Sequence, residues 1–165
     1  PFPHSRGGFS WWPEVTEGCG NNSDETVDNT ALMMLENFIR KLPEVYPVDP
    51  TNIWGVGFSQ GAAALASLSL LSPGLLRRVA LLSGFLPRTL LRFHREEFAA
   101  ATIDTKYFIA HGTKDVIVPF SRAEEAAEEL RAFGAEVLIV SEEIGHKVGS
   151  KSMGELSSWF GERVR

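Results

Sequence analysis

The sequence contains very little cysteine. Cys19 is the single cysteine among 165 residues, so the chain can form no internal disulfide. This cysteine and the 4 histidines form no set with the spacing of a zinc site. Chains without disulfides are typical of the reducing cytoplasm, and we therefore predict a cytoplasmic protein without a metal site.

An excess of positive charge and long apolar runs are also missing. The chain has 16 Lys and Arg against 21 Asp and Glu, which gives a formal net charge of −5. Binding to nucleic acid or to an anionic membrane usually needs a basic patch, so we expect neither partner. No apolar run is long enough to cross a bilayer, and no signal-peptide pattern is present.

The remaining composition is that of one ordinary globular domain. Hydrophobic residues make up 44% of the chain and charged residues 22%, so we expect residues 1–165 to form a single domain around one core. Short apolar runs are separated by helical patterns, which predicts a mostly parallel sheet with helices on both faces. The predicted strands are residues 53–58, 78–83, 107–110 and 137–140.

Three amphipathic patterns predict helices on this sheet. The first contains Met33 and Met34 as core filler and ends before Pro43, while the others cover residues 121–133 and 150–163. Apolar residues at three- and four-residue intervals define their buried faces. These residues are Val27, Ala31, Leu32, Leu35, Phe38, Ile39 and Leu42 in the first helix, and Met153, Leu156, Trp159 and Phe160 in the last.

A glycine-rich turn joins the first predicted strand to a helix. Residues 57–61 read Gly-Phe-Ser-Gln-Gly, and the small residues that follow favour a helix. A serine on so tight a turn is strained, with its hydroxyl clear of the sheet, and the glycines leave room for the neighbouring strand and helix. We predict that Ser59 is a nucleophile and that the amide of Gln60 faces the oxyanion.

Two further segments supply the groups that a serine nucleophile needs. Asp115 and His146 each follow an apolar run, and the carboxyl ends of parallel strands share one edge of a sheet. The chain order Ser59, Asp115, His146 is that of the α/β-hydrolase arrangement. We predict that His146 takes the serine proton and that Asp115 orients the imidazole, so the reaction needs no metal and no organic cofactor.

Asp115 and His146 each have a rival for their role. His111 also follows a predicted strand, but it is too close in sequence to Asp115 to span to both Asp115 and Ser59 easily. We expect it to be a structural residue of the turn. Asp104 precedes its strand and should therefore lie at the opposite edge of the sheet.

Four motifs occur in a fixed order along the chain. They are Gly57-Phe58-Ser59-Gln60-Gly61, Leu82-Ser83-Gly84-Phe85-Leu86-Pro87, His111-Gly112-Thr113-Lys114-Asp115 with Val118-Pro119, and Gly145-His146. Together they resemble the phospholipase/carboxylesterase group of small α/β-hydrolases, which includes acyl-protein thioesterases and lysophospholipase-like esterases. The resemblance implies a serine hydrolase of carboxylic esters or thioesters, with small acyl esters, acylated proteins or lysophospholipids as substrates.

The resemblance also implies upstream sequence that residues 1–56 do not contain. Members of the group have earlier strands, one of which ends in a His-Gly-x-Gly loop that donates the second oxyanion amide. We therefore expect an α/β-hydrolase sheet that lacks its N-terminal strands, and weak activity. We also expect self-association through the bare edge of the strand at residues 53–58.

Five residues are expected to bind substrate. Trp11 and Trp12 resemble the group's Gly-x-x-Trp-Phe segment near the active-site mouth, whereas Phe85 and Leu86 leave a strand at the catalytic edge. Val118 belongs to the third motif. For Trp11, Trp12, Phe85 and Leu86, simple packing of their loops onto the core is an equally good interpretation.

Two other functions stay open from the sequence. A peptidase or lactone hydrolase can have the same fold, because the fold does not fix the substrate. The second alternative function is that of a non-catalytic or weakly active α/β-hydrolase fragment, which acts by binding. The presence of Ser59, Asp115 and His146 favours catalysis, whereas the missing oxyanion loop favours the binding fragment.

Overall fold

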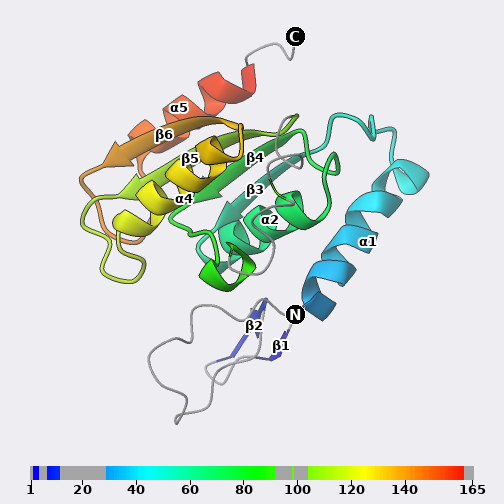
Figure 1. Cartoon of the computed structure of the whole chain (residues 1–165), viewed down its shortest axis with the longest axis horizontal. Helices are drawn as coiled ribbons and strands as arrows, with labels where there is room; N and C mark the ends of the chain where they lie inside the picture. The colour runs from blue at the N-terminus through cyan, green and yellow to red at the C-terminus, as the bar shows by residue number, and fades with distance from the viewer. Residues whose placement is uncertain (1, 4–6, 12–28, 92–97, 99–103, 162–165) are drawn as a thin grey trace.

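The computed structural model describes residues 2–3, 7–11, 29–91, 98 and 104–161 (Figure 1). Trp12 and the start of the first predicted helix lie outside these residues. Among the described helices, none has the length and apolar character needed to span a membrane.

A four-stranded parallel sheet forms the centre of the protein. Its strands are β3 (Trp54–Phe58), β4 (Arg78–Leu82), β5 (Lys106–Gly112) and β6 (Glu136–Glu142), in the order β3-β4-β5-β6. All three neighbouring pairs are parallel and in register along the whole of the shorter strand. The four strands lie where the sequence predicts them, and the expected mostly parallel sheet is confirmed. A short antiparallel pair, β1 (Phe2–Pro3) and β2 (Phe9–Ser10), is separate from this sheet.

Helices cover both faces of the sheet, as the strand alternation requires (Figure 1). The helices α1 (Asn29–Val45), α2 (Gln60–Leu71) and α4 (Ser121–Ala132) share one core cluster with Val79, Leu81, Tyr107 and Ile109. On the opposite face, α5 (Ser150–Gly161) packs through Leu156 and Trp159 against Ala80, Leu82, Phe108 and Ala110. Alternate residues of β4 and β5 thus point into two different cores.

The sequence predicted the end of the first helix and several buried positions wrongly. Pro43 lies inside α1 instead of ending it, because a proline removes only its own N–H and the amide of Tyr46 still bonds to the Leu42 carbonyl at 2.8 Å. The predicted core residues Met33, Met34 and Phe38 are more than half exposed. The stripe of α1 that packs on the core consists of Ala31, Leu32, Leu35 and Ile39, and the other apolar residues lie beside it.

Met153 in α5 is also exposed, although the sequence predicts its burial. The buried positions of this helix are Ser152, Leu156 and Trp159, which are spaced by four and three residues. Met153 is next to this stripe and outside it. Phe160 is partly buried and stacks on the Trp54 ring of β3 at 5.1 Å, so α5 also contacts the first strand of the sheet.

The strand β3 has an open edge within the described part of the chain. The Ile53 carbonyl and the Ser59 amide both bond toward β4. Since backbone groups of successive residues in a parallel strand alternate in direction, the N–H and C=O groups of Trp54, Val56 and Phe58 face the other side. No described strand pairs with them there. These three residues are 37%, 52% and 43% exposed.

The junction between β3 and α2 leaves no space for a side chain at Gly57. A Cβ there would lie 2.5 Å from the Gly61 carbonyl oxygen and 2.6 Å from the Ala62 nitrogen. We therefore expect Gly57→Ala to lower the free energy of unfolding by about 3 kcal/mol, because the helix must move away from the strand. Urea unfolding followed by circular dichroism measures this change.

Gly154→Ala is the matched control, because Gly154 lies on the exposed side of α5 and a Cβ there meets no atom within 4 Å. Alanine should raise the stability at this position by roughly 0.5–1 kcal/mol. Equal effects of the two substitutions would contradict the steric account of the junction.

Candidate active site

Ser59 lies on the turn between β3 and α2 in a backbone conformation that residues other than glycine rarely adopt. Its φ is 53° and its ψ is −119°. The turn is fixed on both sides: the Ser59 amide donates to the Leu82 carbonyl of β4 at 2.8 Å, and its carbonyl accepts from the amides of Ala62 and Ala63. Backbone strain of this kind persists only where the surroundings over-determine it, and it often marks a functional residue.

The loops after β5 and β6 are bonded to each other. The amide of Thr113 donates to the Glu142 carbonyl at 2.9 Å, and that of Lys114 donates to the Ile144 carbonyl at 3.0 Å. A Cβ at Gly112 would clash with the Ile144 carbonyl, so only glycine allows the loops to approach so closely. The loop that carries Asp115 therefore fixes the position of the loop that carries His146.

Ser59, His146 and Asp115 form a continuous chain of hydrogen bonds. The Ser59 Oγ lies 2.9 Å from His146 Nε2, and His146 Nδ1 lies 2.7 Å from Asp115 Oδ2. The other carboxylate oxygen, Oδ1, accepts from the amides of Ile117 and Val118, each at 2.9 Å. The structure thus brings together three residues that are 31 and 87 positions apart in sequence.

The direction of these bonds follows from their chemistry. The Asp115 carboxylate only accepts, so His146 Nδ1 donates to it, and Nε2 is left to accept from the Ser59 hydroxyl. Burial by itself raises the pKa of the Asp115 carboxyl, but the His146 hydrogen bond, the amides of Val118 and Ile117 and the electrostatic attraction of His146 together outweigh it. The net effect lowers the pKa of Asp115, which stays ionised.

Gln60 is the first residue of α2, and its backbone amide belongs to the turn of helix next to Ser59. Within the described chain, no residue accepts a hydrogen bond from this amide. The Gln60 side chain has a separate contact that the sequence did not predict. Its Oε1 accepts from the Ser10 hydroxyl at 3.0 Å and from the Trp11 amide at 2.8 Å, which fastens the N-terminal segment beside the serine turn.

The predicted substrate-binding residues occupy different environments. Trp11 is partly buried against the core beside Gly61, and Phe85 is partly buried with the Arg122 guanidinium 5.5 Å above its ring. Leu86 is 3% exposed and packs in the hydrophobic core. Val118 is buried and contributes its backbone to the Asp115 loop. Trp12 lies outside the described residues.

Several residues near the site were missed in the sequence. The Phe58 ring lies 4.9 Å from the His146 ring. Val116 and Ile117, in the Asp115 loop, are adjacent apolar residues that are 88% and 68% exposed. The motif around Asp115 contained this signal, because two apolar residues directly follow the aspartate in a turn. His111, which we expected in the turn, is the penultimate residue of β5 and is buried.

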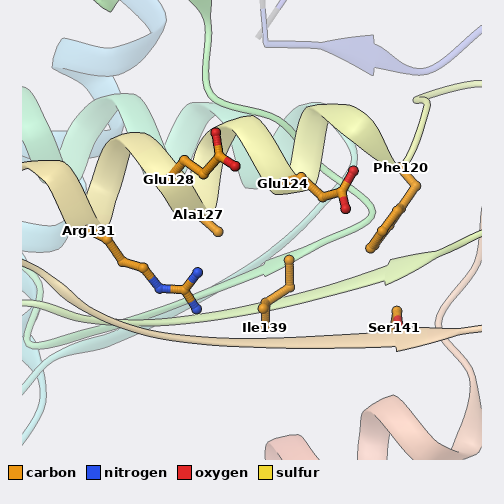
Figure 2. A pocket seen from close by; sticks show the side chains of 7 residues that line it. All are labelled: Phe120, Glu124, Ala127, Glu128, Arg131, Ile139 and Ser141. Carbon is orange, nitrogen blue, oxygen red and sulfur yellow. The ribbon is translucent and has the colours of Figure 1, made fainter.

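A hollow of about 240 Å³ lies between α4 and β6, away from Ser59 (Figure 2). Figure 2 shows the side chains of Glu124, Glu128 and Arg131 reaching from α4 and that of Ile139 rising from β6. The guanidinium of Arg131 donates to the Val137 carbonyl at 3.0 Å. None of the residues that line this hollow belongs to the Ser59 hydrogen-bond chain.

The fold and the strained serine turn define an α/β-hydrolase. The family model for Phospholipase/Carboxylesterase matches residues 2–161, which is nearly the whole chain. The chain therefore belongs to the phospholipase/carboxylesterase family of esterases, as the four motifs predict.

Three known proteins illustrate the similarity. The carboxylesterase SOBER1 of Arabidopsis thaliana is 28% identical over 160 residues, which cover 94% of this chain and 68% of that protein. A Bacillus cereus carboxylesterase structure superposes with a TM-score of 0.72 at 26% identity and covers 84% of this chain and 64% of the other. Acyl-protein thioesterase 2 of Zea mays is similar in fold, with a TM-score of 0.71, 23% identity, and coverage of 92% and 71%.

The lowered pKa of Asp115 predicts a pH-dependent contribution to stability. A carboxyl whose pKa is lower in the folded than in the unfolded protein stabilises the fold above its ordinary value of 3.8, and this stabilisation is lost as the pH falls through the folded pKa. The difference in unfolding free energy between the protein and Asp115→Asn should therefore be constant near pH 7 and shrink below about pH 4. Urea titrations of both proteins from pH 7 to pH 3 measure it; a difference that grows on acidification would contradict the assignment.

Proposed function

We propose that this protein hydrolyses carboxylic ester or thioester bonds through an acyl-enzyme on Ser59. The observation that carries the proposal is the unbroken chain from the Ser59 hydroxyl through both nitrogens of His146 to a buried carboxylate of Asp115. Membership of an esterase family supports the same reaction.

Each residue of the chain has a defined step. His146 Nε2 accepts the hydroxyl proton while Ser59 Oγ attacks the carbonyl carbon, and the imidazolium is stabilised by the Asp115 carboxylate. The same proton then passes to the leaving alcohol or thiol as the carbon–oxygen or carbon–sulfur bond breaks. A water molecule, activated by His146 in turn, releases the acid and restores the serine.

The amide of Gln60 is the oxyanion donor in this proposal. It belongs to the residue after the nucleophile, at the positive end of the α2 dipole, and no described residue uses it. Its position on a rigid helix fixes the donor before the reaction begins, which is the condition for strong stabilisation of a developing charge.

The substrates that we propose are small acyl esters or thioesters, with acylated proteins and lysophospholipids as larger candidates. The acyl chain has apolar side chains to contact around the nucleophile, since Phe58 lies beside His146 while Val116 and Ile117 are exposed on the Asp115 loop. The names of the similar proteins, a carboxylesterase and an acyl-protein thioesterase, agree with this class of substrate.

Substitution of the triad tests the reaction. Ser59→Ala, His146→Ala and Asp115→Asn should each lower kcat for a short p-nitrophenyl ester by about 10³-fold or more. Because the three residues act as a unit, Ser59→Ala/His146→Ala should be hardly slower than either single variant. Initial-rate kinetics, with circular dichroism to check folding, measure both effects.

Val56→Lys, at an exposed position on β3, is the folding control and should retain ester turnover. Turnover that survives Ser59→Ala at nearly the full rate would reject the proposed function and favour a protein that acts by binding.

We also propose that the 165-residue chain self-associates through the open edge of β3. The outward N–H and C=O groups of Trp54, Val56 and Phe58 form a template for pairing with the same strand of a second copy, and their side chains add apolar area. Sedimentation velocity of the 165-residue protein should show species larger than a monomer.

Val56→Lys should shift this protein toward the monomer, since a lysine on an edge strand opposes pairing. Leu138→Lys is the matched control, because Leu138 is 41% exposed on β6, at the opposite edge of the sheet. A monomeric unsubstituted protein, or equal effects of the two lysines, would contradict association through β3.

A further inference from the structure

A second histidine contacts the carboxylate of the proposed triad. His111, near the end of β5, has a side chain with no exposed area, and its Nε2 lies 2.8 Å from the Val118 carbonyl and 3.3 Å from Asp115 Oδ2. Neither our mechanism nor the order of the triad residues uses this imidazole. Its ring also packs edge-on against Phe120, with centroids 6.1 Å apart.

The hydrogen-bond partners decide which ring nitrogen carries the proton. A carbonyl oxygen only accepts, so His111 Nε2 must donate to Val118. His111 Nδ1 is buried and has no hydrogen-bond partner within the described residues. A proton on Nδ1 would leave a buried donor unsatisfied, so Nδ1 is the unprotonated nitrogen.

The protonated Nε2 bonds to the Val118 carbonyl and also lies close to Asp115. Asp115 Oδ2, at 3.3 Å from it, is the same oxygen that accepts from His146 Nδ1 at 2.7 Å. The other oxygen is held by the amides of Ile117 and Val118. His111 thus adds a second side-chain contact to Oδ2, beside that of His146, and it links Asp115 to the Val118 backbone at the other end of the loop.

We propose that His111 is a positioning residue for the Asp115–His146 pair. By holding Oδ2 and the Val118 backbone at once, its Nε2–H keeps the carboxylate aligned with His146 Nδ1. The step that it assists, proton transfer from Ser59 to His146, rests on the proposed function. His111 lies within reach of Val118 and Asp115 but not of Ser59, whose hydroxyl bonds to His146, so His111 is not the base.

Two substitutions of His111 with side chains of similar volume distinguish a role in positioning Asp115 from a role in packing alone. His111→Met removes the donor, whereas His111→Gln places an amide N–H at about the same reach. We expect His111→Met to lower kcat about 10- to 100-fold, as loss of an outer partner does in metal sites, with KM for a short ester nearly unchanged. His111→Gln should restore most of the loss. If His111→Met does not fold, His111→Asn, whose amide is one bond shorter, takes its place with the same expected loss.

Tyr107→Phe is the matched control on the same strand. The Tyr107 hydroxyl is buried and bonds to the Ser69 hydroxyl at 3.0 Å, away from the triad. Its removal deletes one buried hydrogen bond of β5 and should change stability without changing kcat. A loss of kcat in Tyr107→Phe equal to that in His111→Met would overturn the proposal.

Two readouts show whether His111 acts through Asp115. In an Asp115→Asn background, His111→Met should cost less than about twofold in kcat, because residues in one network are not additive. In the otherwise unsubstituted protein, His111→Met should move the downfield proton resonance of His146 Nδ1–H, and Tyr107→Phe should leave it in place.

The same resonance distinguishes failure of this proposal from failure of the proposed function. Absence of Ser59-dependent turnover in the unsubstituted protein would reject the esterase, while the resonance would still report the Asp115–His146 bond. An unmoved resonance in His111→Met, or an equal cost of His111→Met with and without Asp115, would reject His111 as a positioning residue.

Discussion

The close contact between the end of β3 and the start of α2 is the constraint on which the site depends. Gly57 has no room for a Cβ against Gly61 and Ala62, and the small residues at the start of α2 let the helix lie directly on the sheet. This packing holds Ser59 at a φ of 53° and places it at the N-terminus of α2, the positive end of the helix dipole. Core packing, backbone strain and the position of the Ser59 hydroxyl therefore depend on one structural feature.

Electrostatics and loop packing complete the site at the same edge of the sheet. Backbone hydrogen bonds join the loops after β5 and β6 to each other. The backbone around Gly112 therefore positions the loop that carries His146. Asp115 bonds to two amides and to His146 and lies 3.3 Å from a second imidazole, and its lowered pKa keeps it charged beside His146. Partners of this kind fix the tautomer of the base, which determines the direction of proton transfer.

The sequence predicted the parts of this structure that depend on local pattern. Apolar runs located the four strands, and the rule that parallel strands end at one edge brought Ser59, Asp115 and His146 together correctly. Burial on the helices was harder to predict, because Met33, Phe38 and Met153 are apolar but lie beside the stripe that packs. The contact of His111 with Asp115 was also missed, since it depends on how the loop folds back between Asp115 and Val118.

Covalent labelling tests the central claim, that Ser59 is an activated nucleophile, most directly. The intact protein is treated with a fluorophosphonate, digested, and mapped by mass spectrometry, with His146→Ala as a second sample. We expect one adduct per chain, on Ser59, and much slower labelling of His146→Ala. An adduct on another serine, or labelling of Ser59 at the same rate without His146, would contradict it.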